Sequence, residues 1–148
     1  MRRLAAPVLV VLALAGCGGS KPRLKPQVFA SEATKVCRSA KTHSRALARP
    51  VTPGDVPVFL RRAARVLRTA VSSLEALRPP ARLDASWRRQ TTLLDRQLTV
   101  VVGLSHSVHD GKGDPVAAVQ RVAGALRSDR TATDDGWRRL GLAGCVAG

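Results

Sequence analysis

The stretch Val56–Leu77 reads VPVFLRRAARVLRTAVSSLEAL, and its spacing decides the fold class. Apolar or small residues recur there at steps of three and four, which places them on one face of an α-helix: Leu60, Ala63, Ala64, Leu67, Ala70, Val71, Leu74 and Leu77. Asp55 stands before the stretch as a candidate N-cap, Pro57 fits the first helical turn, and Pro79-Pro80 ends the pattern. The stretch therefore predicts an amphipathic helix with one buried side.

Three further segments share this period. A helix is expected over 28–47, another over 84–110, and a fourth that begins at Pro115 behind the N-cap Asp114 and ends at Gly141. The polar run SDRTATDDG at 128–136 leaves room for a kink or local fraying in the fourth helix. Four amphipathic helices joined by short breaks predict an all-α fold, an up-down-up-down four-helix bundle over 28–148.

The first residues have the character of an export signal. Arg2 and Arg3 precede an uncharged, mostly apolar run over 4–15, which is too short to span a bilayer because spanning takes about 20 helical residues. The run ends in LAGC at 14–17, which resembles the lipobox of bacterial lipoproteins. The resemblance implies a signal peptide over 1–16, palmitate-type acylation of Cys17, and a lipid-anchored place on the extracytoplasmic face of the cell membrane. The alternative is an ordinary signal peptide cut near Ala15, with Cys17 left as a free thiol.

Residues 17–27 are expected to form the lipidated end and a flexible basic tether, because Gly, Ser and two Pro oppose regular structure there. Cys37 and Cys145 remain as an even pair near the two ends of the bundle. Outside the cytoplasm such a pair predicts a disulfide. In the expected topology the first helix starts and the fourth helix ends at the same end of the bundle, so the two predictions agree.

Three motifs lie along 28–145: a first helix that begins near Phe29 and reaches Cys37, an LRPP break at 77–80, and a closing Gly141-Leu142 followed by Cys145. With the LAGC motif, this pattern resembles small helical lipoproteins of high-GC actinobacteria. These motifs are structural, so the resemblance implies no activity and no site residues. Twenty Arg against five Lys is also what a GC-rich genome encodes.

The charge is strongly basic, at +15 overall, and residues 17–68 hold twelve Lys and Arg against only Glu32 and Asp55. Folding the first hairpin about residue 52 gathers a candidate anion-binding surface: Lys41, Arg45, Arg49, Arg61, Arg62, Arg65 and Arg68. Its expected partner is an anionic cell-wall polymer or lipid headgroups, and the alternative is a solvated outer face. Nucleic acid is not expected, because aromatic residues make up 3% of the chain, Tyr is missing, and export removes the encounter. The sequence leaves a protein partner unknown.

Motifs of catalysis and cofactor binding are missing from the sequence, including GxSxG, a P-loop and HExxH, so a non-enzymatic binding or structural role is expected, with no cofactor. His106 and His109 are three residues apart and share a helix face, and His43 is expected at the same height near the end away from the tether. The alternative function is therefore a metal or small-ligand binding protein that uses these three histidines. Three solvated side chains explain the same spacing.

Overall fold

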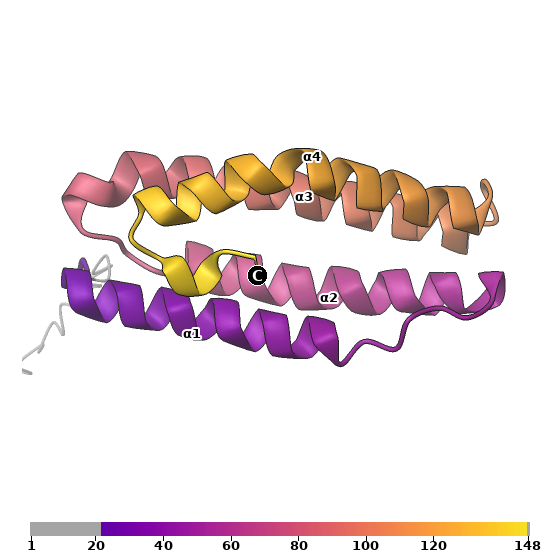
Figure 1. The fold of residues 1–148 in the computed structure, drawn as a ribbon, viewed down its shortest axis with the longest axis horizontal. Coiled ribbons are helices and arrows are strands. Elements are labelled where there is room, and N and C mark those ends of the chain that lie inside the picture. Colours follow the sequence, from indigo (N-terminus) through magenta and orange to yellow (C-terminus); the bar gives the residue numbers. More distant parts are fainter. Residues whose placement is uncertain (1–21, 148) are drawn as a thin grey trace, which may run out of the picture.

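The computed structural model describes residues 22–147, which form four helices in two layers. α1 (Pro26–Arg45) and α2 (Val56–Glu75) make one layer, and α3 (Asp84–His109) and α4 (Pro115–Arg139) make the other (Figure 1). Successive helices run in opposite directions, so the predicted all-α, up-down-up-down four-helix bundle is confirmed. Three short 3-10 helices complete the described part: η1 (Pro53–Asp55), η2 (Ala81–Leu83) and η3 (Ala143–Cys145).

The ends of the helices follow local chemistry, with one difference from expectation. Asp114 caps α4 as predicted, because its carboxylate accepts hydrogen bonds from the backbone N–H groups of Val116 and Ala117 at 3.0 and 3.1 Å. Asp55 does not cap α2 with its side chain. Its carboxylate accepts from the backbone N–H and the hydroxyl of Thr52, and thereby closes a capping box over η1. Hydrogen bonds from the Thr52 backbone and side chain lower the pKa of the Asp55 carboxyl.

The described part of the predicted tether is attached to the bundle. α1 begins at Pro26, two residues earlier than predicted. The backbone N–H of Leu24 donates to the carbonyl of Arg78 at 2.8 Å, and the guanidinium of Arg23 donates to the Pro79 carbonyl and to Asp84. Residues 22–27 therefore lie against the connection between α2 and α3. The prediction of a flexible tether over 17–27 is wrong for this part of the segment. Cys17 and the signal peptide over 1–16 lie outside the described residues.

The core consists of two apolar clusters. The first surrounds the start of α1 and contains an aromatic group in which the Phe29 and Trp87 rings meet edge to face at 4.9 Å and Trp137 lies 6.1 Å from Trp87. The second lies at the opposite end of the bundle, where Val56 and Leu60 of α2 pack with Val101 and Val108 of α3 and with Ala118 and Val122 of α4. Leu67 packs against both clusters.

α4 passes through its polar run without a break. The helix is continuous to Arg139, so the local fraying that the run allowed does not occur, and Gly136 lies inside the helix. Gly136 permits a close approach, because a Cβ there would stand 1.8 Å from the side-chain oxygen of Gln90. The Gln90 amide is 3% exposed and donates to the Thr133 carbonyl at 3.1 Å. A buried polar contact between α3 and α4 therefore explains the glycine.

The segment after α4 joins the two layers. Gly141 ends α4 with φ at +72°, and the N–H of Leu142 returns to the Trp137 carbonyl at 2.9 Å, as in a Schellman motif. η3 then crosses to α1, where the predicted disulfide joins Cys37 and Cys145. Within residues 22–147, α1 packs against α2 and η3 and makes no close backbone approach to α4. The C-terminal segment thus fills the position where α1 and α4 would otherwise meet.

Candidate functional site

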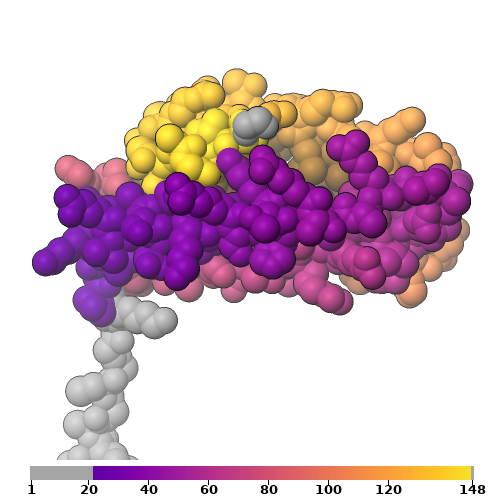
Figure 2. Space-filling view, turned by 60° about the horizontal axis from the view of Figure 1, so that its bottom comes forward, coloured from indigo at the N-terminus to yellow at the C-terminus, as the bar shows by residue number. Residues whose placement is uncertain are grey.

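Beyond the C-terminal segment, the space between the layers remains open as a groove of about 680 Å³. α1 ends at Arg45, well before the far end of the bundle, so α1 covers only part of the length of α2 (Figure 1). The space-filling surface is hollowed at this place, beside the C-terminal segment and between the first hairpin and α4 (Figure 2). α1 has 20 residues, against 26 in α3 and 25 in α4, and the groove lies where α1 does not extend.

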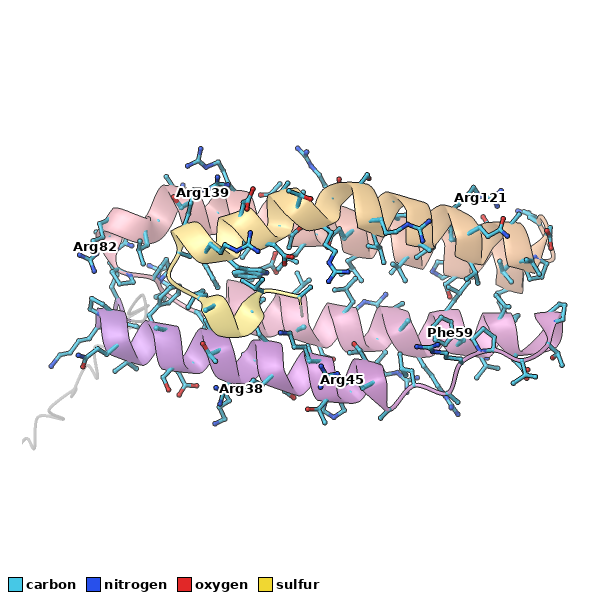
Figure 3. The ribbon with its side chains drawn as sticks, viewed as in Figure 1. Arg38, Arg45, Phe59, Arg82, Arg121 and Arg139 are labelled. Atoms are coloured by element: carbon cyan, nitrogen blue, oxygen red, sulfur yellow. A yellow bond between two sulfur atoms is a disulfide. The ribbon has the colours of Figure 1, made fainter. Side chains whose placement is uncertain are left out.

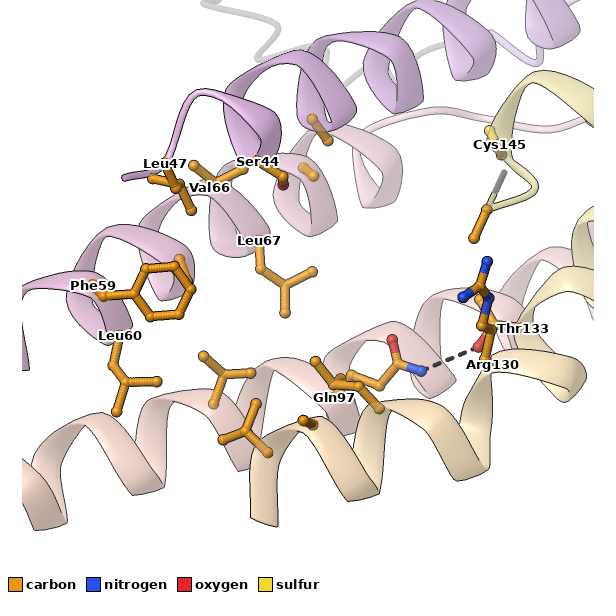
Figure 4. Close-up of a pocket in the computed structure, with 18 of the residues that line it drawn as sticks. Ser44, Leu47, Phe59, Leu60, Val66, Leu67, Gln97, Arg130, Thr133 and Cys145 are labelled. Atoms are coloured by element: carbon orange, nitrogen blue, oxygen red, sulfur yellow. Dashed lines mark hydrogen bonds between the residues drawn. The ribbon is translucent and has the colours of Figure 1, made fainter. Parts of the chain in front are cut away.

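The walls of the groove are apolar and mostly half-buried. α2 contributes Phe59, Ala63, Val66, Leu67 and Ala70, and α4 contributes Val119, Val122, Ala123 and Leu126. Leu47 stands over the Phe59 end (Figure 4). Most of these side chains pack on one side against the second core cluster and face the opening on the other. The arrangement leaves apolar surface accessible along a continuous trough.

Polar groups gather toward the other end of the groove. Gln97 of α3 donates to the hydroxyl of Thr133 at 3.1 Å, and Arg130 extends from α4 into the space below the C-terminal segment (Figure 4). The Arg130 guanidinium lies 3.9 Å from the carboxylate of Asp134, whose other oxygen accepts from the backbone N–H of Ala147 at 2.9 Å. The side chain of Asp134 is 12% exposed, whereas that of Arg130 is 54% exposed. A cation therefore stands at the accessible polar end.

A second hollow of about 380 Å³ continues from this end, because the two share Ala40, Ser44 and Trp137 among their lining residues. Lys41 and Arg45 of α1 line it. The ammonium of Lys41 donates to the backbone carbonyl of Val146, and Arg45 lies at the end of α1 (Figure 3). Two cations of the first helix thus lie beside the polar end of the groove.

The predicted basic surface is divided by the structure. A fold about residue 52 sets His43 opposite Arg61, whereas His43 lines one surface hollow with Arg65 and Thr69, so α1 lies at least four residues further along α2. Lys41 and Arg45 face the C-terminal segment instead. Arg49 lies in the connection after α1, and the outer surface of α2 carries the rest: Arg61, Arg62, Arg65 and Arg68, all exposed. The seven residues therefore do not form one continuous face.

The three histidines do not converge. His43 lies against the middle of α2, beside Arg65 and Thr69, and its Nδ1 is 2.8 Å from the carbonyl of Ser39. His109 follows Val108, which packs with the first turns of α2 at the far end. About ten residues of α2 separate the two levels, which corresponds to roughly 15 Å. No group of three or more His, Cys, Asp or Glu side chains within 22–147 is placed to hold a metal ion, so the alternative in which His43 and His109 converge with His106 is not supported.

The sequence did not reveal the groove. The periodic positions of α2 that line it, Ala63 and Ala70 among them, are the same positions that predicted a fully covered helix face. The run RPVTPGD at 49–55 could have indicated the groove, because its two prolines prevent α1 from continuing toward the far end of the bundle. Arg130 and Thr133, in the polar run that suggested fraying, instead form one end of the site.

Comparison of the chain with protein-family models, with curated proteins and with solved structures found no match. Among the helices of residues 22–147, none has the length and apolar character needed to cross a bilayer.

Proposed function

We propose that this protein is an exported lipoprotein, anchored through Cys17 to the extracytoplasmic face of the cell membrane, that binds an apolar ligand and catalyses no reaction. The observation that carries the binding role is the groove between α2 and α4. Ligand sites are clefts of about 300–1,000 Å³ that are mostly apolar and hold a few polar groups for orientation. The groove has this size, these walls and one polar end.

The start of the described chain supports an anchored arrangement. Pro22 is five residues after Cys17, and five residues span at most about 18 Å. Arg23 and Leu24 are bonded to the connection between α2 and α3, so a lipid on Cys17 would hold that end of the bundle near the bilayer. Exposed Lys25, Arg78 and Arg82 lie at the same end and would favour an anionic leaflet.

The outer surface of α2 supports a second candidate, which is binding of an anionic cell-wall polymer or of lipid headgroups. Arg61, Arg62, Arg65 and Arg68 are exposed within eight positions of one helix. Clustered guanidinium groups bind phosphates and carboxylates, and salt weakens such binding. Polymer binding that falls with salt and with charge reversal at Arg61, Arg62 and Arg65 would support this role, and unchanged binding in the triple variant would exclude it.

Blocking the groove tests the first proposal. Ala63→Trp and Ala123→Trp place an indole in the trough from opposite walls, whereas Ala132→Trp places one on the exposed side of α4 as a matched control. Nile red, an uncharged apolar dye, should bind the native chain and the Ala132 variant and lose most of its binding in both groove variants. Circular dichroism confirms that each variant is folded. Equal dye binding in all four proteins would overturn the proposal.

The membrane anchor has its own test. Cys17→Ala removes the acylated sulfur and should release the protein from the membrane fraction into the soluble fraction, because stable anchoring depends on the acyl chains. Retention of the variant in the membrane fraction would contradict lipid anchoring at Cys17.

A further inference from the structure

We propose that the groove binds a single aliphatic chain that carries an anionic head, with the chain along α2 and α4 and the head beside Arg130. A fatty acid and a lysophospholipid share this chemistry, through a carboxylate and a phosphate respectively. The inference names the ligand class of the groove and therefore rests on the proposed function.

The length of the groove matches one lipid chain. Its wall on α2 runs from Phe59 to Ala70, and eleven residues of α-helix rise about 16 Å. The hydrocarbon core of a bilayer is about 30 Å thick and holds two chains end to end, so one chain spans about 15 Å. A chain of that length fills the trough from Phe59 to the polar end.

The chemistry of the walls favours an aliphatic chain over a flat or sugar-like ligand. Between the two ends, the α2 and α4 walls present Ala, Val and Leu side chains, and the aromatic members of the lining, Phe59 and Trp137, belong to opposite ends. An aromatic or sugar ring would meet no stacking partner along the middle. A methylene chain needs only close contact with small apolar groups and loses nothing by the shortage of hydrogen-bond partners there.

The positive charge at the polar end of the groove favours a ligand with an anionic head. Arg130 stands at the polar end of the groove, and Lys41 and Arg45 line the hollow that continues from it. The acidic residue in the lining is Asp134, which is buried and already accepts the N–H of Ala147. Among the lining residues of the described chain, three cations and one carboxylate lie around the place that the head would occupy, and that carboxylate pairs with Arg130. A guanidinium binds carboxylate or phosphate through charge-assisted hydrogen bonds, which are stronger than those between neutral groups.

Competition with Nile red on the full chain tests the head and the chain separately. The competitors are palmitate, lysophosphatidylglycerol and uncharged hexadecanol, each below the concentration at which it aggregates. At least one of the two anionic competitors should displace the dye at a concentration about tenfold lower than hexadecanol does. Which of them is stronger distinguishes a carboxylate from a phosphate head.

Arg130→Gln should weaken the stronger anionic competitor about tenfold and leave hexadecanol unchanged. Arg127→Gln, on an exposed position of the same helix outside the groove, is the matched control and should change neither. If Nile red binds in the groove but hexadecanol competes as well as both anions do, the anionic head is refuted while the binding role stands. If Nile red itself fails to bind, the proposed function fails as well.

Discussion

Gly136 offers a sharp test of how α3 and α4 pack, because alanine there sets helix propensity against close packing. Gly136→Ala should gain about 0.5–1 kcal/mol, since glycine in the middle of a helix is costly. The new Cβ, however, would stand 1.8 Å from the Gln90 side-chain oxygen and 2.8 Å from its amide carbon. Gln90 is 3% exposed, so its amide has little room to withdraw.

The cost of that overlap can be bounded. Forcing an extra carbon into a packed interior costs about 1–3 kcal/mol. Movement of the amide also breaks its hydrogen bond to the Thr133 carbonyl, worth about 0.5–1.5 kcal/mol. After the gain in propensity, Gly136→Ala should lower the free energy of unfolding by about 0.5–4 kcal/mol.

Two comparisons isolate the cause. Gly124 lies in the same helix, and a Cβ there meets nothing within 4 Å, so Gly124→Ala should raise the free energy of unfolding by about 0.5–1 kcal/mol. In a Gln90→Ala background, Gly136→Ala should become stabilising by a similar amount, because the obstructing amide is gone. Urea unfolding followed by circular dichroism measures all four changes. If Gly136→Ala stabilises the native chain as much as Gly124→Ala does, the close contact with Gln90 carries no energetic weight.

Three further changes test other contacts by urea unfolding. Reduction of Cys37–Cys145, which closes a 108-residue separation, should lower the free energy of unfolding by about 4–5 kcal/mol, and equal midpoints with and without reductant would contradict this. Asp114→Ala should cost about 1 kcal/mol through the lost cap of α4, whereas no change would show that the cap is replaceable. Hydrogen bonds from Arg88 and Arg23 lower the pKa of Asp84, so its contribution is present above pH about 4 and is lost as the pH falls through the lowered pKa. Asp84→Asn should therefore unfold with a shallower dependence on pH below 4, and an unchanged slope would refute the pairing.

Helix period and terminators made the fold predictable, because both are local properties of the chain. The three-and-four spacing of α2 and the cap at Asp114 required no knowledge of distant residues. The disulfide was predicted from an even pair of cysteines outside the cytoplasm, and the expected topology agreed because it brought Cys37 and Cys145 to the same end. The register between α1 and α2 did not follow, because the length and path of the connection set it. As a result, the prediction placed Lys41 and Arg45 beside the arginines on the outer surface of α2, whereas in the structure they lie away from them.

The predicted sites failed for a related reason. A shared helix face brings His106 and His109 near each other, but convergence with His43 requires α1 to reach the far end of the bundle. α1 ends at Arg45, and Pro50 and Pro53 oppose its continuation, since proline removes a backbone donor and disfavours helix in the residue before it. The length of α1 therefore determined both where His43 lies and which part of the bundle stays uncovered.

The same short helix links the sequence to the proposed ligand site. Had the pattern of α1 continued through 46–52, another two turns would have run toward the Phe59 end and packed against Ala63 and Val66 of α2, so the two layers would have closed on each other. The proline-containing connection instead leaves those side chains half-buried. On the other side of the opening, the disulfide holds the C-terminal segment between α1 and α4, which prevents the layers from collapsing together there. An early helix end and a covalent spacer thus act in the same direction: both keep the apolar trough open, with Arg130 at its accessible end.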